Sequence, residues 1–288
     1  MIRIYLLHLP SLAAAANLPL EATGGAKRRL ERSGGELLLK YALADWKKRS
    51  RADVRPTLAD FPRTARAASP VFHRLSLSPA ALEALLRAPA PHTETAAHGK
   101  PYLTDDPTLF YSLSHSGDLA ALALSDENVG LDLQRARPLR GMELADRFFT
   151  AEDSALLGQC EDEAARAALF FRMWTVKEAY IKYTGRGMAE TLRSFDIDWQ
   201  ARAIVSRTGS APAYFAEIPV AAVGSEVPAR AATSEHSTPT QAEMPPEHSA
   251  PTQESHDDGA AARASDYYMT LAAYNAAPVP EVTFLAFA

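Results

Sequence analysis

Apolar and polar residues alternate along this chain in patterns that predict short strands interspersed with helices. A first strand is expected at residues 3–7, where Arg3 is followed by Ile-Tyr-Leu-Leu. Similar patterns predict strands at 109–113, 119–124, 129–134, 267–274 and 282–287. The strands lack the regular helix spacing of βαβ units, so the sequence predicts an α+β fold rather than a parallel α/β sheet.

Two helices are predicted in the first third of the chain. Residues 28–48 carry leucines at helical spacing, although Gly34-Gly35 is expected to be a weak point because glycine lowers helix propensity. Residues 78–87 begin with Ser78-Pro79, a pair that is typical of a helix start.

Two more helices are predicted in the second half of the chain. Residues 150–157 begin with Thr150 three positions before Asp153, which resembles a capping box. Residues 164–183 form the longest helical pattern, and Gly185 and Gly187 are expected to end it.

Residues 224–264 differ from the rest of the chain in composition. They are rich in Ala, Ser, Thr, Pro and Glu, with few large apolar residues, so they are predicted to be a disordered insertion between strands. Three histidines lie within them, at spacings too wide and irregular to predict a metal site. They are His236, His248 and His256.

Charge is distributed unevenly. Residues 224–264 carry seven Asp or Glu and two Arg, which accounts for the net charge of −5. Residues 24–66 carry twelve Lys or Arg and five Asp or Glu. This basic stretch is either a solvated helix face or a surface that attracts polyanions.

The composition fits a globular protein with one large domain or two smaller ones, since 47% of the 288 residues are hydrophobic. Cys160 is the single cysteine, which excludes an internal disulfide and is consistent with a cytoplasmic location. The apolar first 20 residues loosely resemble a signal peptide, but His8 and Pro10 interrupt them. No later segment is long and apolar enough to predict a membrane span.

The expected strand at 129–134 carries candidate metal ligands. Side chains alternate along a strand, so Asp132 and Gln134 share one face while Leu131 and Leu133 occupy the other. Paired oxygen-bearing side chains suit a hard cation such as Mg²⁺. The alternative is a half-exposed strand that presents Asp and Gln to water.

The helix predicted at 164–183 places four distinctive residues on one face. Helical spacing aligns Phe171, Trp174, Glu178 and Lys182. Aromatic neighbours draw Glu178 toward the core, where a carboxylate needs a partner or a metal. The alternative is an ordinary surface pair between Glu178 and Lys182.

A third pattern is Ser114-His115-Ser116-Gly117, which predicts a turn between two strands. Its hydroxyl groups and imidazole suit phosphate oxygens. A Ser/His nucleophile pair is disfavoured because adjacent strand residues point to opposite faces and the chain lacks a Gly-x-Ser-x-Gly elbow. The alternative is a polar hairpin turn.

The order and spacing of five motifs between residues 100 and 182 resemble the 4′-phosphopantetheinyl transferases, and the resemblance covers about residues 27–195. The chain length resembles their monomeric, surfactin-synthetase-activating (Sfp) type. The motifs are Lys100-Pro101-Tyr102, Ser114-His115-Ser116, Gly130-Leu131-Asp132-Leu133-Gln134, Phe148-Phe149-Thr150-Ala151-Glu152 and the run from Trp174 through Lys177-Glu178-Ala179 to Lys182.

The resemblance implies two similar α+β halves related by a pseudo-twofold axis, with coenzyme A in the cleft between them. We place the halves at 1–125 and 126–288, with the 224–264 insertion in the second. By position, Asp132, Gln134 and Glu178 are expected to hold Mg²⁺, or Mn²⁺ in its place. The family usually has Glu where this chain has Gln134, so one negative charge is missing from the site.

The resemblance also implies roles for the basic and polar residues. Lys182 is expected to neutralise charge on the phosphate under attack, while Asp132 and Glu178 act in catalysis and Glu178 accepts the proton of the carrier serine. The expected contacts to coenzyme A are Lys27, Arg28, Arg32, Lys100, Ser114 and His115.

The implied activity transfers the phosphopantetheine group of coenzyme A to a serine of an apo acyl or peptidyl carrier protein and releases 3′,5′-adenosine bisphosphate. A monomer with no nucleic-acid or membrane partner is expected. Two alternatives remain open. One is a non-catalytic homologue that binds coenzyme A or a carrier, suggested by Gln134; the other is a metal-dependent phosphohydrolase using Asp132 and Glu178.

Overall fold

The computed structural model describes residues 1–18, 24–50, 70–137, 143–207, 209, 213–220, 267–274 and 280–287. The expected disordered insertion at 224–264 lies outside the described residues, as does part of the basic stretch, 51–66. Helices and strands are mixed along the chain, which confirms the α+β prediction. The pseudo-twofold relation between two halves stays a prediction.

One five-stranded sheet draws its strands from both ends of the chain. Its order is β2 (Val71–Leu77), β12 (Glu281–Phe287), β1 (Ile2–His8), β6 (Leu119–Ser125) and β5 (Phe110–Ser116). Strand β12 runs parallel to both β1 and β2, while β1, β6 and β5 pair antiparallel. The division of the chain at 125/126 stays a prediction, but the last strand joins the same sheet as the first.

The second five-stranded sheet is antiparallel throughout. Its order is β7 (Val129–Arg135), β11 (Tyr267–Ala273), β10 (Ala213–Glu217), β9 (Ala203–Ser206) and β8 (Phe195–Asp198). A small hairpin, β3 (Thr93–Thr95) and β4 (Pro101–Leu103), stands apart from both sheets. The predicted strand at 129–134 is therefore the edge strand β7 of this sheet.

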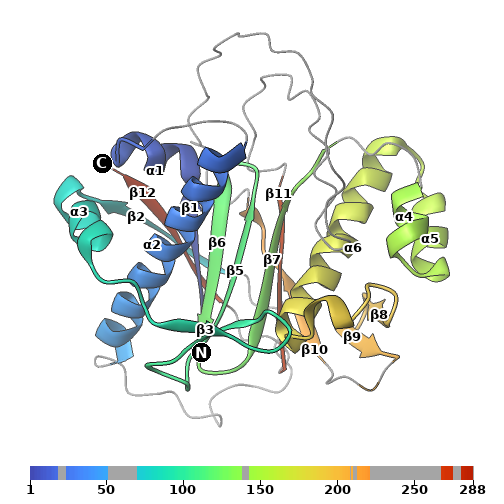
Figure 1. Cartoon of the computed structure of the whole chain (residues 1–288). Helices are drawn as coiled ribbons and strands as arrows, with labels where there is room; N and C mark the ends of the chain where they lie inside the picture. Colours follow the sequence, from blue (N-terminus) through green and yellow to red (C-terminus); the bar gives the residue numbers. More distant parts are fainter. Residues whose placement is uncertain are drawn as a thin grey trace.

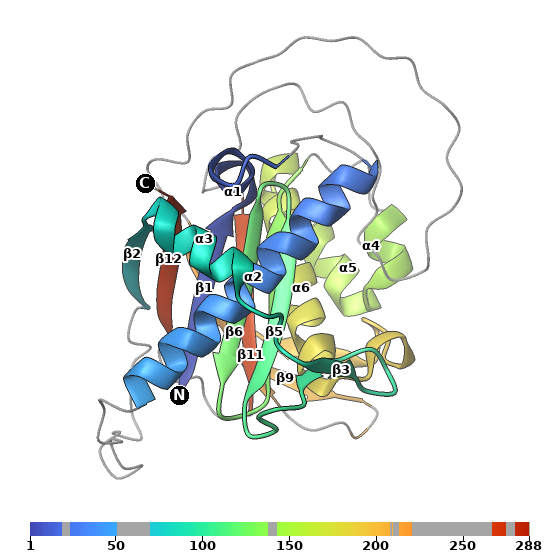
Figure 2. The ribbon, with the colours of Figure 1, turned by 60° about the vertical axis from the view of Figure 1, so that its left-hand side comes forward.

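The two sheets pack face to face between two groups of helices (Figures 1 and 2). Residues of β1, β6, β7, β11 and β12 form one apolar cluster between the sheets. Helices α1 (Leu9–Ala15), α2 (Gly24–Ser50) and α3 (Pro79–Arg87) cover the outer face of the first sheet. Helix α6 (Glu163–Thr184) covers the second sheet, with α4 (Glu143–Phe148) and α5 (Ala151–Gly158) beside it. None of the described helices is long and apolar enough to cross a membrane.

Helix α2 is continuous through Gly34 and Gly35, so the expected weak point is wrong. A Cβ added at Gly34 would lie 2.5 Å from Leu9 Cδ2, and one at Gly35 would lie 2.6 Å from Leu113 Cδ2. The two glycines let α2 approach α1 and β5 closely, and this packing offsets their low helix propensity.

The capping predictions for the other helices are confirmed. The Ser78 side chain accepts from Ala81 N at the start of α3. Thr150 and Asp153 form the expected capping box of α5. Helix α6 ends at Gly185, whose φ of 67° is the left-handed conformation that glycine adopts without strain.

Removing residues 224–264 and joining the ends with a short Gly-containing turn is expected to leave the fold intact. Strands β10 and β11, which flank this segment, are antiparallel neighbours in one sheet, so a short connection can join them. Loop-closure entropy changes slowly with length, and the shorter connection is expected to stabilise the protein by about 1 kcal/mol. Equilibrium urea unfolding measures the change. Loss of cooperative unfolding would show that the segment supports the fold.

Candidate functional site

The site forms where α6 lies against β7. A Cβ added at Gly130 would lie 2.0 Å from the carbonyl oxygen of Ala179, so only glycine allows helix and strand to approach this closely. Side chains two residues apart on a strand share a face, which places Asp132 and Gln134 on the α6 side with Gly130. This close approach brings Asp132 alongside Glu178 and Lys182 of α6.

Asp132 is buried, with 5% of its surface exposed, and its two carboxylate oxygens differ. Oδ1 accepts hydrogen bonds from Lys182 Nζ at 2.7 Å and from Ser114 Oγ at 2.9 Å. Oδ2 is buried and has no partner among the described residues. A buried carboxylate oxygen without a donor is costly, so Oδ2 is the atom that a cation would satisfy.

Glu178 supplies a second carboxylate beside Asp132. Burial and, to a smaller extent, nearby Asp132 raise the pKa of Glu178, Lys182 opposes both effects, and the resulting pKa is about 7. Two carboxylates this close repel each other, and a divalent cation between them would relieve the repulsion.

The donor atoms at this place fit Mg²⁺. Asp132 and Glu178 offer carboxylate oxygens and Gln134 offers an amide oxygen, all of the hard type that Mg²⁺ prefers. The described residues contain no group of three or more His, Cys, Asp or Glu able to hold a metal ion. A metal here would therefore rely on two carboxylates, with other oxygens completing its shell.

Residues 114–116 lie within strand β5 rather than in a turn, so the expected turn is misplaced. The chain reverses at Gly117, whose φ is 57°. Alternate serines of β5 instead bond to the edge of β7. Oγ of Ser112, Ser114 and Ser116 accepts from the backbone N–H of Leu131, Leu133 and Arg135, respectively. We call these three bonds the serine seam, because they join the two sheets.

His115 lies on the opposite side of β5 from the serine seam and is close to α2. Its ring Nδ1 is 3.5 Å from a carboxylate oxygen of Glu31, and its side chain is 45% exposed. Burial lowers the pKa of His115, Lys27 and Lys182 lower it further, and Glu31 and Asp132 raise it. The charges of Lys27 and Lys182 thus act on His115, whose ring contacts Glu31. Sequence reasoning missed Glu31, one helical turn after Lys27.

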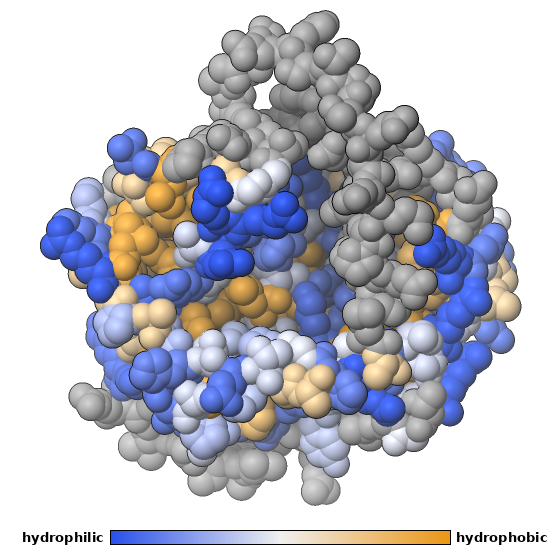
Figure 3. Space-filling view, in the orientation of Figure 1, coloured by the Kyte–Doolittle hydropathy of each residue, from blue (hydrophilic) through white to orange (hydrophobic). Residues whose placement is uncertain are grey.

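The predicted contacts Arg28 and Arg32 are exposed one turn apart on α2. Figure 3 shows hydrophilic residues gathered over the N-terminal end of this helix. The described part of the predicted basic surface is therefore accessible to a polyanion beside His115.

Lys100 is placed differently from the other predicted contacts. Its ammonium group donates to Asn128 Oδ1, to the carbonyl of Val129 at 3.1 Å and to the carbonyl of Tyr183 at 3.0 Å. An ammonium group has three protons, so all of them are used within the protein. Burial lowers the pKa of Lys100 to about 8. The expected phosphate contact of Lys100 stays a prediction without geometric support.

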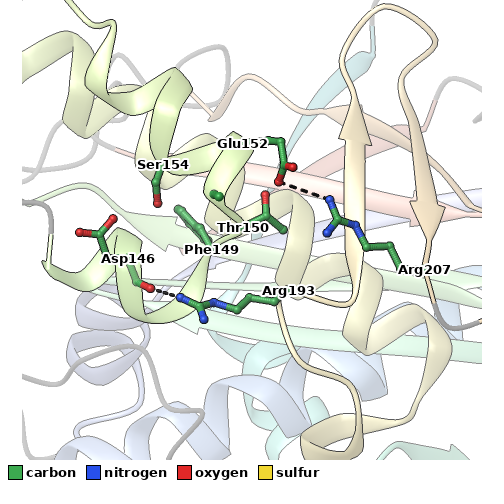
Figure 4. Close-up of a pocket in the computed structure, with 8 residues that line it drawn as sticks. Asp146, Phe149, Thr150, Glu152, Ser154, Arg193 and Arg207 are labelled. Carbon is green, nitrogen blue, oxygen red and sulfur yellow. Dashed lines mark hydrogen bonds and ion pairs between the residues drawn. The ribbon is translucent and has the colours of Figure 1, made fainter.

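A separate hollow lies beside α5 (Figure 4). Arg193 donates to the carbonyl of Asp146, and Arg207 pairs with Glu152 and Asp196. Both arginines therefore have protein partners, and the predicted metal ligands do not line this hollow. Its lining residues are Asp146, Phe149, Thr150, Ala151, Glu152, Ser154, Arg193 and Arg207.

The chain is similar in sequence to known proteins. Residues 128–223 match the family model of the 4′-phosphopantetheinyl transferase superfamily. The chain is 36% identical over 141 residues to the 4′-phosphopantetheinyl transferase AcpT of Salmonella typhi, covering 48% of this chain and 69% of that protein.

Two Bacillus proteins match shorter stretches. The 4′-phosphopantetheinyl transferase psf-1 of Bacillus pumilus is 40% identical over 103 residues, which are 35% of this chain and 43% of that protein. The 4′-phosphopantetheinyl transferase Sfp of Bacillus subtilis is 35% identical over 104 residues, 36% of this chain and 45% of Sfp. The chain thus spans less than half the length of these two relatives.

Proposed function

Because this chain belongs to the 4′-phosphopantetheinyl transferase superfamily, we propose that it transfers the phosphopantetheine group of coenzyme A to a serine of an apo carrier protein. The observation that carries the proposal is the arrangement at Asp132. Its Oδ2 is buried and has no partner within the described part of the chain, and it lies beside the Glu178 carboxylate and the Lys182 ammonium group. Oxygen ligands for a cation and a positive charge for a phosphate meet there.

In the proposed reaction, the serine oxygen of the carrier attacks the β-phosphorus of coenzyme A. The bond from that phosphorus to the bridging oxygen breaks, and 3′,5′-adenosine bisphosphate leaves. Glu178 is the proposed acceptor of the serine proton. Lys182 neutralises charge on the phosphate under attack.

Asp132, Glu178 and the Gln134 amide would hold Mg²⁺. When bound, the ion neutralises charge on the pyrophosphate of coenzyme A. Lys27 and His115, together with Arg28 and Arg32 on the exposed side of α2, would contact the phosphates of the nucleotide. The protein would act on its carrier as a cytoplasmic monomer, with no nucleic-acid or membrane partner.

The test of this function is mass spectrometry of several apo carrier proteins incubated with the chain, coenzyme A and Mg²⁺. The proposal predicts that a carrier gains the mass of one phosphopantetheine group and that 3′,5′-adenosine bisphosphate appears in equal amount. Turnover of coenzyme A without a carrier would indicate a phosphohydrolase instead. Binding of coenzyme A without transfer to any carrier would indicate a non-catalytic homologue.

Replacing Gln134 with Glu is expected to lower the Mg²⁺ concentration needed for half-maximal transfer. The substitution restores a negative charge on the face of β7 that carries Asp132, and added ligand charge strengthens the binding of a hard cation. A magnesium titration of the transfer rate measures the effect. Gln159→Glu adds the same charge at an exposed position after α5 and serves as the control. An identical titration for Gln134→Glu and wild type would exclude Gln134 from the metal site.

A further inference from the structure

We propose that Ser114 is a positioning residue, which fixes the Asp132 carboxylate so that Oδ2 is available to the cation, and does not itself contact coenzyme A. This inference rests on the proposed function. It reassigns a residue that the family resemblance placed among the coenzyme A contacts.

The hydroxyl group of Ser114 has no hydrogen-bonding capacity left for a phosphate. A serine hydroxyl has one proton to donate and two lone pairs that accept. Ser114 Oγ donates to Asp132 Oδ1 at 2.9 Å, and it accepts from Leu133 N at 3.1 Å and from Lys182 Nζ at 3.0 Å. All three interactions are made within the protein, and Ser114 is only 5% exposed. A phosphate oxygen could bind Ser114 only if one of these bonds were broken.

The hydrogen bonds of Ser114 and Lys182 also fix the orientation of the Asp132 carboxylate. Oδ1 accepts from Ser114 and from Lys182, so rotation of the carboxylate would break two hydrogen bonds. Oδ2 then keeps its place with no partner among the residues that the structure describes. Residues that orient a metal ligand in this way commonly change metal affinity by about 10-fold to 100-fold when they are replaced.

Strand β5 itself provides the control. Ser112 is buried to the same extent as Ser114, and its Oγ accepts from Leu131 N at 2.9 Å, so it makes the same kind of seam bond. Its other hydrogen bond within the described residues is a long one, 3.5 Å, to the carbonyl of Leu131. Ser112→Ala therefore removes a bond between the sheets without removing a bond to Asp132.

The experiment titrates the full chain with Mn²⁺ in the presence of coenzyme A and without a carrier, and follows free Mn²⁺ by electron paramagnetic resonance. Ser114→Ala is expected to weaken Mn²⁺ binding about 10-fold or more, while Ser112→Ala binds it like wild type. Urea unfolding is expected to show similar losses of stability in the two variants. At saturating metal, the KM for coenzyme A is expected to be unchanged in Ser114→Ala.

Three outcomes would overturn the inference. Equal weakening of Mn²⁺ binding in both variants would give Ser114 a purely structural role. A raised KM for coenzyme A with unchanged Mn²⁺ binding would restore the direct contact. If the wild-type chain binds no Mn²⁺, Asp132 is not a metal ligand, and Ser114 cannot position it for one. If Ser114→Ala does not fold, Ser114→Cys keeps a side chain of the same connectivity and weakens the hydrogen bonds. Failure to modify any carrier, with the expected Mn²⁺ difference intact, would overturn the proposed function alone.

Discussion

Asp132→Asn is expected to reduce transfer of phosphopantetheine by about 10²-fold to 10³-fold, the range in which removal of a principal charge-stabilising group falls. The amide keeps the shape of the carboxylate but removes its negative charge, so Oδ2 is lost as an anionic ligand. Lys182 also loses its charged partner at 2.7 Å. The measurement is the rate at which an apo carrier gains mass, at several Mg²⁺ concentrations.

The melting temperature of Asp132→Asn is expected to stay near that of wild type, because the substitution removes no core volume and removes a buried negative charge of which one oxygen has no partner among the described residues. Asp105→Asn is a suitable control, since Asp105 is exposed and its hydrogen bond with His92 lies on the surface. Transfer by Asp132→Asn at the wild-type rate, at any Mg²⁺ concentration, would exclude Asp132 from the reaction.

The parts of this molecule that depend on local periodicity could be predicted from the sequence. Alternation along residues 129–134 placed Asp132 and Gln134 on one face, and helical spacing placed Glu178 near Lys182. Both patterns act within a single element, so neighbouring residues determine them. Gly130 then made these two faces meet, because it lets α6 lie directly on β7.

Contacts between elements that are distant in sequence could not be predicted in this way. Nothing near residues 281–287 indicates that β12 pairs with β1 at the other end of the chain. The pattern Ser-x-Ser-x-Ser at 112–116 is a signal for the serine seam, but it becomes meaningful only when β7 is known to lie opposite. The partners of Lys100 could not be predicted either, because its ammonium group can donate to a phosphate and to a set of carbonyl oxygens equally well.

A buried ion pair that the sequence did not reveal holds α5 against α6. Lys177 is fully buried, and its ammonium group lies 2.8 Å from Asp153 Oδ2. It also donates to the carbonyls of Leu192 at 2.8 Å and Phe195 at 3.0 Å. Asp153 in turn accepts from Thr150 N in the capping box of α5. Lys177 thus connects α6 with the start of α5 and with the segment that leads into β8.

Lys177→Met is expected to lower the free energy of unfolding by about 3–5 kcal/mol, because it leaves the buried Asp153 carboxylate without a countercharge. Two carbonyls also lose their donor. Equilibrium urea unfolding measures the loss. Arg207→Gln, which removes the exposed pairs with Asp196 and Glu152, is the control and is expected to cost much less than Lys177→Met.

The double variant Lys177→Met/Asp153→Asn separates charge from packing. It removes the uncompensated carboxylate, while the Asn side-chain oxygen can still accept from Thr150 N, so part of the lost stability is expected to return. A double variant no more stable than Lys177→Met would show that the charge on Asp153 is not the main cause of the lost stability. The main cause would then be the loss of the hydrogen bonds to the carbonyls of Leu192 and Phe195. If Lys177→Met and wild type unfold at the same midpoint concentration of urea, the buried pair contributes nothing to the stability of α5 and α6.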